Sequence, residues 1–304
     1  MVNKGNKMNL LKSYENGNCS VEIFDDGTKV RKWEGSPSPL FPESIDLKIT
    51  NYCDAGCAWC HEKSTKKGEH ASFNSVFEII ETLPAGCEIA IGGGNPLSHP
   101  QLELILERMK MQGLIANMTV NAFHLEGYNH TINRFRDQGL VHGLGVSYNK
   151  KYHQDVVEII DDNTIVHVIA GVDKAATVMN LPKEWKFLVL GYKSFGFGSN
   201  YKRLKPVDRS LSAWRYWISP MMRKFHVSFD NLALRQLDIE SRLIDGVWDK
   251  LYMGDDGEFT MYADAINSEY AVSSTSSSRH EVSGTIQEMF STVRESKRTA
   301  LNIL

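Results

Sequence analysis

The stretch from Ile45 to Cys60, IDLKITNYCDAGCAWC, decides how the rest of this chain is interpreted. Apolar and polar residues alternate over Ile45–Ile49, which predicts a β-strand. The strand runs directly into a loop that carries Cys53, Cys57 and Cys60 in a C-x3-C-x2-C spacing. The chain has five cysteines, and neither of the other two lies in a second cluster. The three thiols of this loop are therefore expected to act together at the end of a strand.

Three thiolates held this close together can ligate three irons of a 4Fe-4S cubane. Most such clusters have four cysteine ligands and transfer electrons. With three protein ligands, the fourth iron has an open coordination position that can accept a substrate or a cofactor. The spacing therefore predicts a 4Fe-4S cluster with one iron available to a further ligand.

The cysteine spacing, with Trp59 directly before the third cysteine, resembles that of the radical S-adenosylmethionine (radical SAM) family. The resemblance implies that Cys53, Cys57 and Cys60 hold the cluster, and that SAM chelates the open iron through its amino and carboxylate groups. Trp59 would then pack near SAM. It also implies that an electron breaks the sulfonium bond to give a 5′-deoxyadenosyl radical. A reductase such as flavodoxin or ferredoxin is an expected partner.

The three cysteines could also bind zinc or form a disulfide. Structural zinc usually has four ligands, commonly in paired C-x2-C spacings. His61 directly follows Cys60 and would be a cramped fourth ligand, and no second pair occurs downstream. A non-catalytic zinc-binding interaction module is therefore the alternative from another class. A disulfide has less support, because nothing indicates an oxidising compartment. Cys19 and Cys87 are expected to be buried apolar residues.

The composition and charge of the chain indicate where the protein is located and which partners it lacks. The chain has 304 residues, 42% hydrophobic and 23% charged, and a formal net charge of −3. This balance gives no global field to attract nucleic acid or an anionic membrane. No apolar stretch is long enough to span a bilayer, and the polar N-terminus lacks the apolar core of a signal peptide. A cytoplasmic protein with no membrane partner is expected, and nucleic acid is not indicated.

Strand-like and helix-like segments alternate from Ser44 onward, which predicts parallel pairing through right-handed crossovers. Six such units precede residue 195. The resemblance implies that they form a partial (β/α)6 TIM-type barrel, although periodicity alone does not separate an open barrel from a doubly wound sheet. The predicted strands are Ile45–Ile49, Glu88–Ile91, Met118–Asn121, Val141–Tyr148, Thr164–Ala170 and Trp185–Gly191.

The sequence predicts three regions: an N-terminal β-hairpin appendage at 1–43, the core barrel at 44–200, and a mixed, mainly helical C-terminal extension at 201–304 packing on the barrel. No cysteine lies beyond Cys87, so the extension cannot be the auxiliary-cluster domain of many peptide-modifying relatives. In the N-terminal region the sequence predicts a hairpin over Ser20–Trp33. In the C-terminal region it predicts a basic loop over Tyr201–Arg209, a strand over Glu258–Ala263, and helices over Leu211–His226, Leu232–Asp238, Ser241–Trp248 and Val282–Lys297.

A glycine-rich motif, Ile91–Leu97 or IGGGNPL, follows the second predicted strand. It resembles the family's Gly-Gly-Glu-Pro motif, whose backbone and acid hold the SAM amino group. Gly93 and Gly94 match the glycines. Asn95 stands in the place of the acid, so ammonium binding would depend more on backbone carbonyls. The alternative is a plain strand-to-helix turn.

Weaker correspondences extend the predicted SAM site to strand ends. In relatives, polar residues there bind the ribose and carboxylate of SAM, and Asn121, Ser147 and Asn149 occupy such positions. Gly191 would let the sixth strand pass the adenine. The alternative is that each residue only satisfies its own strand end or turn.

Residues that could transfer a proton to or from a substrate lie on the same predicted rim. They are His61 and Glu62 after the cysteine loop, and Tyr192 and Lys193 after the sixth strand. The alternative for each is an ordinary solvated loop residue.

These features together predict a radical SAM enzyme that abstracts hydrogen from an unidentified substrate. A small molecule such as a nucleotide or amino acid derivative is slightly favoured over a peptide. A peptide-modifying maturase and a glycyl-radical activating enzyme stay open as alternatives. The whole-chain pattern resembles uncharacterised radical SAM proteins of phages and bacteria, and that resemblance supplies no substrate.

Overall fold

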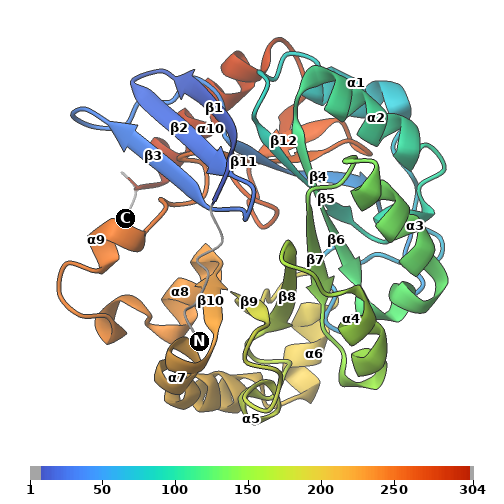
Figure 1. Ribbon diagram of the computed structural model, residues 1–304, viewed down its shortest axis with the longest axis vertical. Coiled ribbons are helices and arrows are strands. Elements are labelled where there is room, and N and C mark those ends of the chain that lie inside the picture. Colours follow the sequence, from blue (N-terminus) through green and yellow to red (C-terminus); the bar gives the residue numbers. More distant parts are fainter. Residues whose placement is uncertain (1–7, 302–304) are drawn as a thin grey trace.

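The computed structural model describes residues 8–301, with side chains described as far as residue 297. Residues 1–7, which belong to the polar N-terminal segment, lie outside the described residues. The fold is mixed α/β, built on one ten-stranded sheet and one smaller three-stranded sheet (Figure 1). No helix in the described part of the chain is long and apolar enough to cross a membrane.

The large sheet has the order β10-β9-β8-β7-β6-β5-β4-β11-β12-β13. Every neighbouring pair from β10 to β11 is parallel, and the last two pairs are antiparallel. Its strands are β4 (Ser44–Thr50), β5 (Glu88–Gly93), β6 (Ile115–Asn121), β7 (Gly143–Ser147), β8 (Thr164–Ile169), β9 (Lys186–Leu190), β10 (His226–Phe229), β11 (Thr260–Asp264), β12 (Glu269–Ala271) and β13 (His280–Glu281). The six strands predicted from the sequence correspond to β4 to β9.

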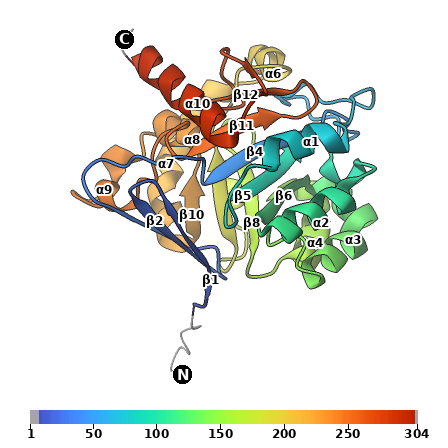
Figure 2. The same cartoon turned by 90° about the horizontal axis from the view of Figure 1, so that it is seen from above.

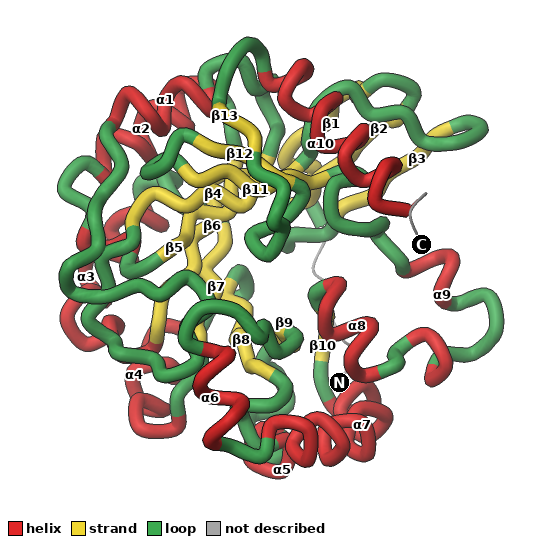
Figure 3. The backbone as a smooth tube through the Cα atoms, turned by 180° about the vertical axis from the view of Figure 1, so that it is seen from behind, coloured by secondary structure: helices red, strands yellow, loops and turns green. Residues whose placement is uncertain are grey.

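Helices cover one face of this sheet, and Figure 3 shows α1 to α4 outside the strands. The helices are α1 (Phe73–Ile80), α2 (Leu102–Gln112), α3 (Leu125–Asp137), α4 (His153–Ile159), α5 (Ala175–Val178), α6 (Gly198–Leu204), α7 (Val207–Lys224), α8 (Asn231–Leu237), α9 (Trp248–Leu251) and α10 (Ile286–Leu301), with 3-10 turns η1 (Pro96–Ser98), η2 (Ala122–His124), η3 (Lys150–Tyr152) and η4 (Glu240–Arg242).

Alternation along each strand separates a helix-facing side from an inner side. On β4, Ile45, Leu47 and Ile49 are fully buried in the main apolar core, whereas Asp46 and Lys48 point to the other face. Burial of the apolar side chains on the helix-facing side is the main favourable term in folding. The opposite, inner face carries polar residues such as Asp46 and Lys48, and a functional site can form there.

The sheet is strongly curved. In a flat sheet, β9 and β12 would lie about 34 Å apart, at about 4.8 Å for each strand step. Lys193, just after β9, nevertheless donates to Ser274 Oγ, just after β12, at 3.0 Å. The curvature brings strand ends that are distant in the sheet order around one inner space.

The N-terminal region is a three-stranded antiparallel sheet of β1 (Leu10–Asn16), β2 (Cys19–Phe24) and β3 (Lys29–Trp33). Figure 2 shows β1 and β2 at the opposite end of the molecule from α6. The predicted hairpin corresponds to β2 and β3. β1 was not predicted, because six of its seven residues are exposed or half-buried and show no apolar alternation. Cys19 and Cys87 are fully buried, as expected.

Two predictions beyond residue 200 are wrong. The segment Tyr201–Arg209 is not a loop: it holds the end of α6 and the start of α7, and Tyr201 packs on Trp59. The segment Ser241–Trp248 is not a helix, because Gly246 takes a positive φ of 74° that interrupts helical backbone. The short strand β10 was also missed, and β10 and β11 both join the large sheet.

Candidate functional site

The cysteine loop lies at the C-terminal end of β4, the end of a parallel strand where ligand sites form. Cys53, Cys57 and Cys60 are all half-buried free thiols. Cys53 N–H donates to Thr65 O at 2.9 Å, and Cys60 N–H donates to Cys57 O at 3.1 Å. Burial, together with the nearby thiols of Cys60 and Cys53, raises the pKa of Cys57 to about 11. The thiolate form in this loop thus needs a compensating cation, which a bound iron cluster supplies.

A cavity of about 410 Å³ adjoins the cysteine loop. Its lining includes Cys53 and Cys57 from the loop and Phe197 from the segment after β9. The space next to the thiols is therefore not filled by protein side chains. A group larger than one ion has room there, which fits the predicted cluster.

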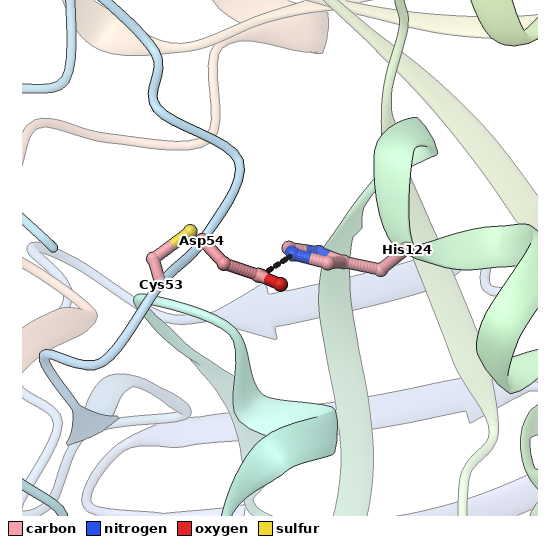
Figure 4. A group of neighbouring side chains, drawn as sticks. All are labelled: Cys53, Asp54 and His124. Carbon is pink, nitrogen blue, oxygen red and sulfur yellow. Dashed lines mark hydrogen bonds and ion pairs between the residues drawn. The ribbon is translucent and has the colours of Figure 1, made fainter. Parts of the chain in front are cut away.

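The arrangement of ligand atoms also bears on the zinc alternative. A tetrahedral zinc with Zn–S bonds of about 2.3 Å would hold its sulfurs about 3.8 Å apart. Among the described residues, the group of metal-ligating side chains with atoms within 4.8 Å of one another is Cys53, Asp54 and His124 (Figure 4). This group contains one cysteine of the three. The loop does not gather its three sulfurs around one ion, and that favours the larger cluster.

The contact between Asp54 and His124 ties the cysteine loop to β6 (Figure 4). His124 Nε2 lies 2.8 Å from Asp54 Oδ1, and His124 is 4% exposed at the end of η2. Burial lowers the pKa of His124, so the neutral ring donates from Nε2. Sequence reasoning missed this pair, because its members are 70 residues apart and belong to no motif.

The glycine motif contacts Thr50 and Tyr52, the residues that precede the cysteine loop. Gly94 N–H donates to Thr50 O and Asn95 N–H donates to Tyr52 O, both at 2.7 Å. A Cβ atom on Gly93 would lie 2.3 Å from Thr50 O, and one on Gly94 would lie 2.1 Å from Tyr52 O. Gly93 also has a φ of 105°. These glycines are required for the contact that positions the start of the cysteine loop.

Asn95, the residue in place of the usual acid, is 2% exposed. Its Oδ1 accepts from Leu97 N–H at 3.2 Å and caps η1. The side-chain carbonyl is thus already used within the turn, and the backbone of the motif is what stays available to a ligand.

Two of the predicted strand-end residues lie side by side. Asn121 and Ser147 are register partners on β6 and β7. Asn121 Nδ2 lies 3.5 Å from Cys57 Sγ, and its Oδ1 accepts from Phe123 N–H. Asn121 therefore touches the cysteine loop directly. Its predicted contact with SAM, like that of Ser147, stays a prediction.

The other two strand-end residues have local structural partners. Asn149 Oδ1 accepts from Lys151 N–H at 3.0 Å and caps η3. Gly191 N–H donates to Asp230 Oδ1 at 2.9 Å, and a Cβ on Gly191 would lie 2.5 Å from Leu232 Cγ. Packing of α8 accounts for this glycine, and an adenine contact at either position stays a prediction.

Directly after Cys60, a charged network crosses the inner space. Lys48 Nζ lies 2.9 Å from Glu62 Oε2 and 3.1 Å from Asp264 Oδ2. Lys48 is 8% exposed and Asp264 is 5% exposed. Burial alone would raise the pKa of Glu62, but His61 and Lys48 together lower it to about 2. The network joins β4, the cysteine loop and β11.

His61 and Lys193 extend this network toward β9. His61 Nε2 lies 3.3 Å from Glu62 Oε1 and 3.3 Å from Lys193 Nζ. Burial lowers the pKa of His61, which favours the neutral ring. Three of the four predicted proton-transfer residues therefore lie together. Tyr192 does not join them, because its buried hydroxyl donates to Gly198 O at 2.6 Å.

The segment after β9 supports the cysteine loop from the other side. Phe197 N–H donates to Cys60 O at 2.9 Å, and a Cβ on Gly196 would lie 2.3 Å from His61 O. Trp59 is half-buried and packs edge-on against Tyr201 of α6, with ring centroids 5.6 Å apart. Whether Trp59 also packs near SAM stays a prediction.

Comparisons with known proteins point to one enzyme family. Residues 47–179 match the model of the radical SAM superfamily. The chain is 23% identical over 252 residues to the probable GTP 3′,8-cyclase of Methanocaldococcus jannaschii, an alignment that covers 75% of this chain and 82% of that protein.

Solved structures of similar fold include SuiB from Streptococcus suis. SuiB bound to S-adenosylmethionine has a TM-score of 0.55 and 11% identity, over 86% of this chain and 68% of SuiB. SuiB bound to the precursor peptide SuiA has a TM-score of 0.58 and 12% identity, over 83% and 65%. At this identity the likeness concerns the fold alone. Over residues 47–179 the chain therefore matches the radical SAM superfamily, whose members are enzymes with a 4Fe-4S cluster and S-adenosylmethionine as cofactors.

Proposed function

We propose that Cys53, Cys57 and Cys60 ligate the 4Fe-4S cluster and that the enzyme abstracts hydrogen from a substrate in the inner space of its curved sheet. When bound, the cluster and SAM supply a 5′-deoxyadenosyl radical. The observation that carries the proposal is the convergence of three free thiols at the end of β4, beside a cavity and against the glycine motif. We infer that the curved sheet is the partial (β/α)6 barrel of the family.

The glycine motif would hold the methionine end of SAM through its backbone. Because Asn95 Oδ1 is taken by Leu97 N–H, the ammonium group would meet backbone carbonyls of Gly93 and Gly94. The remaining contacts to SAM are assigned to residues at the same end of the sheet: Trp59, Asn121, Ser147, Asn149 and Gly191. Asn121 has the strongest support of these, since it already lies against Cys57.

His61, Glu62 and Lys193 are proposed to hold or move a proton at the substrate. Glu62 Oε1 and Lys193 Nζ both lie 3.3 Å from Nε2 of the neutral His61 ring. This one nitrogen can hold a proton toward the Glu62 carboxylate or accept a proton from Lys193. Tyr192 is the weakest member of the proposed set, because its hydroxyl is already bonded to Gly198 O.

The substrate is proposed to be a small molecule such as a nucleotide or amino acid derivative. The relative from M. jannaschii is named as a GTP cyclase, which supports this class. A peptide is the second candidate, because one structural neighbour was solved with a precursor peptide. We infer a cytoplasmic enzyme that receives electrons from a reductase, with its core at 44–200 flanked by the N-terminal and C-terminal regions.

Anaerobic reconstitution with iron and sulfide tests the function. We expect a brown protein with about four irons and four sulfides, which forms 5′-deoxyadenosine from SAM and dithionite. Iron, sulfide, zinc and 5′-deoxyadenosine are measured on the same sample. A colourless protein that keeps one tightly bound zinc and cleaves no SAM would show that the site is structural.

A further inference from the structure

The inner face of the large sheet is hollow next to β4. Asp46 lies in the middle of this central strand and is exposed to solvent, although Ile45 and Leu47 on either side of it are buried. The neighbouring strand β5 places only Ala90 and Gly92 beside Asp46 and Lys48. A Cβ atom on Gly92 would meet no other atom within 4 Å. Open space therefore extends over this part of the inner face.

Two polar side chains face this space without a partner. Asp46 and Tyr262 are register partners on β4 and β11. Tyr262 is on the inner face, because Asp264, two residues further on the same strand, bonds to Lys48. Tyr262 is 4% exposed. Neither its hydroxyl nor the Asp46 carboxylate has a hydrogen bond to any described residue. Tyr262 is an almost fully buried side chain without a hydrogen-bond partner, and the Asp46 carboxylate beside it is exposed, so a ligand in this space can reach both groups.

The charges around Asp46 are mainly negative. Although the Asp46 side chain is open to the inner space, the protein around it displaces bulk water and raises its pKa; Lys193 acts against this, and Asp256 and Asp230 raise the pKa further. The nearby cations are already engaged: Lys193 donates to Ser274 Oγ, and Lys48 pairs with two carboxylates.

One further cation lies close to Tyr262. The Arg279 guanidinium carbon is 4.8 Å from the centroid of the Tyr262 ring, and its Nη2 donates to Ser274 O. Arg279 belongs to the loop between β12 and β13, stands over the ring face and forms no ion pair with Asp46, and its Nη1 is buried without a hydrogen-bond partner. An anionic group beside Asp46 would still meet like charge at close range.

We propose that Asp46 and Tyr262 bind a cationic nitrogen group, an ammonium or a guanidinium, of the substrate. A carboxylate accepts short charge-assisted hydrogen bonds from such a group, and the tyrosine hydroxyl completes its coordination. This inference deepens the proposed function and rests on it for the identity of the ligand as substrate. A substrate that places an ammonium or guanidinium group at Asp46 and Tyr262 would therefore bind, and one that places a phosphate there would not.

The test is calorimetric titration of the reconstituted holoenzyme with agmatine, which carries both an ammonium and a guanidinium group. Saturating SAM is present, so that the probe does not occupy the position of the cofactor's amino group. We expect agmatine to bind, Asp46→Asn to weaken binding at least about tenfold, and Tyr262→Phe to weaken it about threefold. Asp245→Asn, an exposed carboxylate elsewhere, is the matched control and leaves binding unchanged.

The outcomes are separable from those of the proposed function. SAM cleavage and iron content are measured on the same preparations, so loss of cluster chemistry is detected independently of agmatine binding. Circular dichroism confirms that each variant is folded. The inference is overturned if wild-type protein binds tripolyphosphate and not agmatine, or if Asp46→Asn and Tyr262→Phe both bind agmatine as tightly as wild type.

Discussion

Replacing any one of Cys53, Cys57 and Cys60 by alanine is expected to reduce SAM cleavage to background. With two thiolates left, a cubane has two irons without protein ligands, and the cluster no longer stays bound in its active form. We expect a loss of more than about 100-fold, beyond the 10- to 100-fold loss typical of substitutions outside the ligand set. The measurement is 5′-deoxyadenosine formed from SAM and dithionite under anaerobic conditions, normalised to protein.

The chain supplies a matched control for these variants. Cys87 is fully buried and far from the loop in the apolar core, so Cys87→Ala removes a thiol without touching the proposed ligands. It should keep its iron, its sulfide and its SAM cleavage. If all three loop variants cleave SAM at the rate of Cys87→Ala, the ligand assignment is wrong even if the protein contains iron.

The strands that carry this site could be predicted because each is locally encoded. β4 to β9 combine short apolar runs with glycines or polar residues at their C-terminal ends, and this pattern can be recognised in the sequence without knowledge of the tertiary contacts. β10, His226–Phe229, carries only two apolar residues and takes its structure from pairing with β9. Its neighbours in space, and not its own sequence, make it a strand.

The parts of the site that could be predicted are those with fixed spacing. The cysteines and the glycine motif are close in sequence, and the structure places them in contact through Thr50 and Tyr52. Lys48 and Asp264 are more than two hundred residues apart, so their ion pair has no local signal. Gly191 and Tyr192 show the opposite difficulty: they stand at a strand end, but their nearest partners belong to α8 and to the start of α6.

The ion pairs of Lys48 provide the second large expected effect. Lys48→Met leaves the buried carboxylates of Glu62 and Asp264 without their shared cation. Removing one partner of a buried ion pair typically costs about 3–5 kcal/mol. At about 3 kcal/mol, a chain of this length should melt about 5 °C lower. Thermal unfolding of the apoprotein, followed by circular dichroism, measures this shift without any contribution from the cluster.

Lys32→Met is the matched control, since it breaks a lysine–glutamate pair on the surface. Lys32 lies 3.2 Å from Glu22, with 67% and 37% of their side chains exposed, and such a pair contributes about 0–1 kcal/mol. Adding Glu62→Gln to Lys48→Met removes one of the two stranded charges and should recover part of the lost stability. Because Glu62 follows Cys60 by two residues, Lys48→Met should also lower iron binding, and the double variant should recover part of it. Equal melting temperatures for Lys48→Met and Lys32→Met would mean that water or rearrangement compensates the carboxylates, and that this network does not hold the cysteine loop in place.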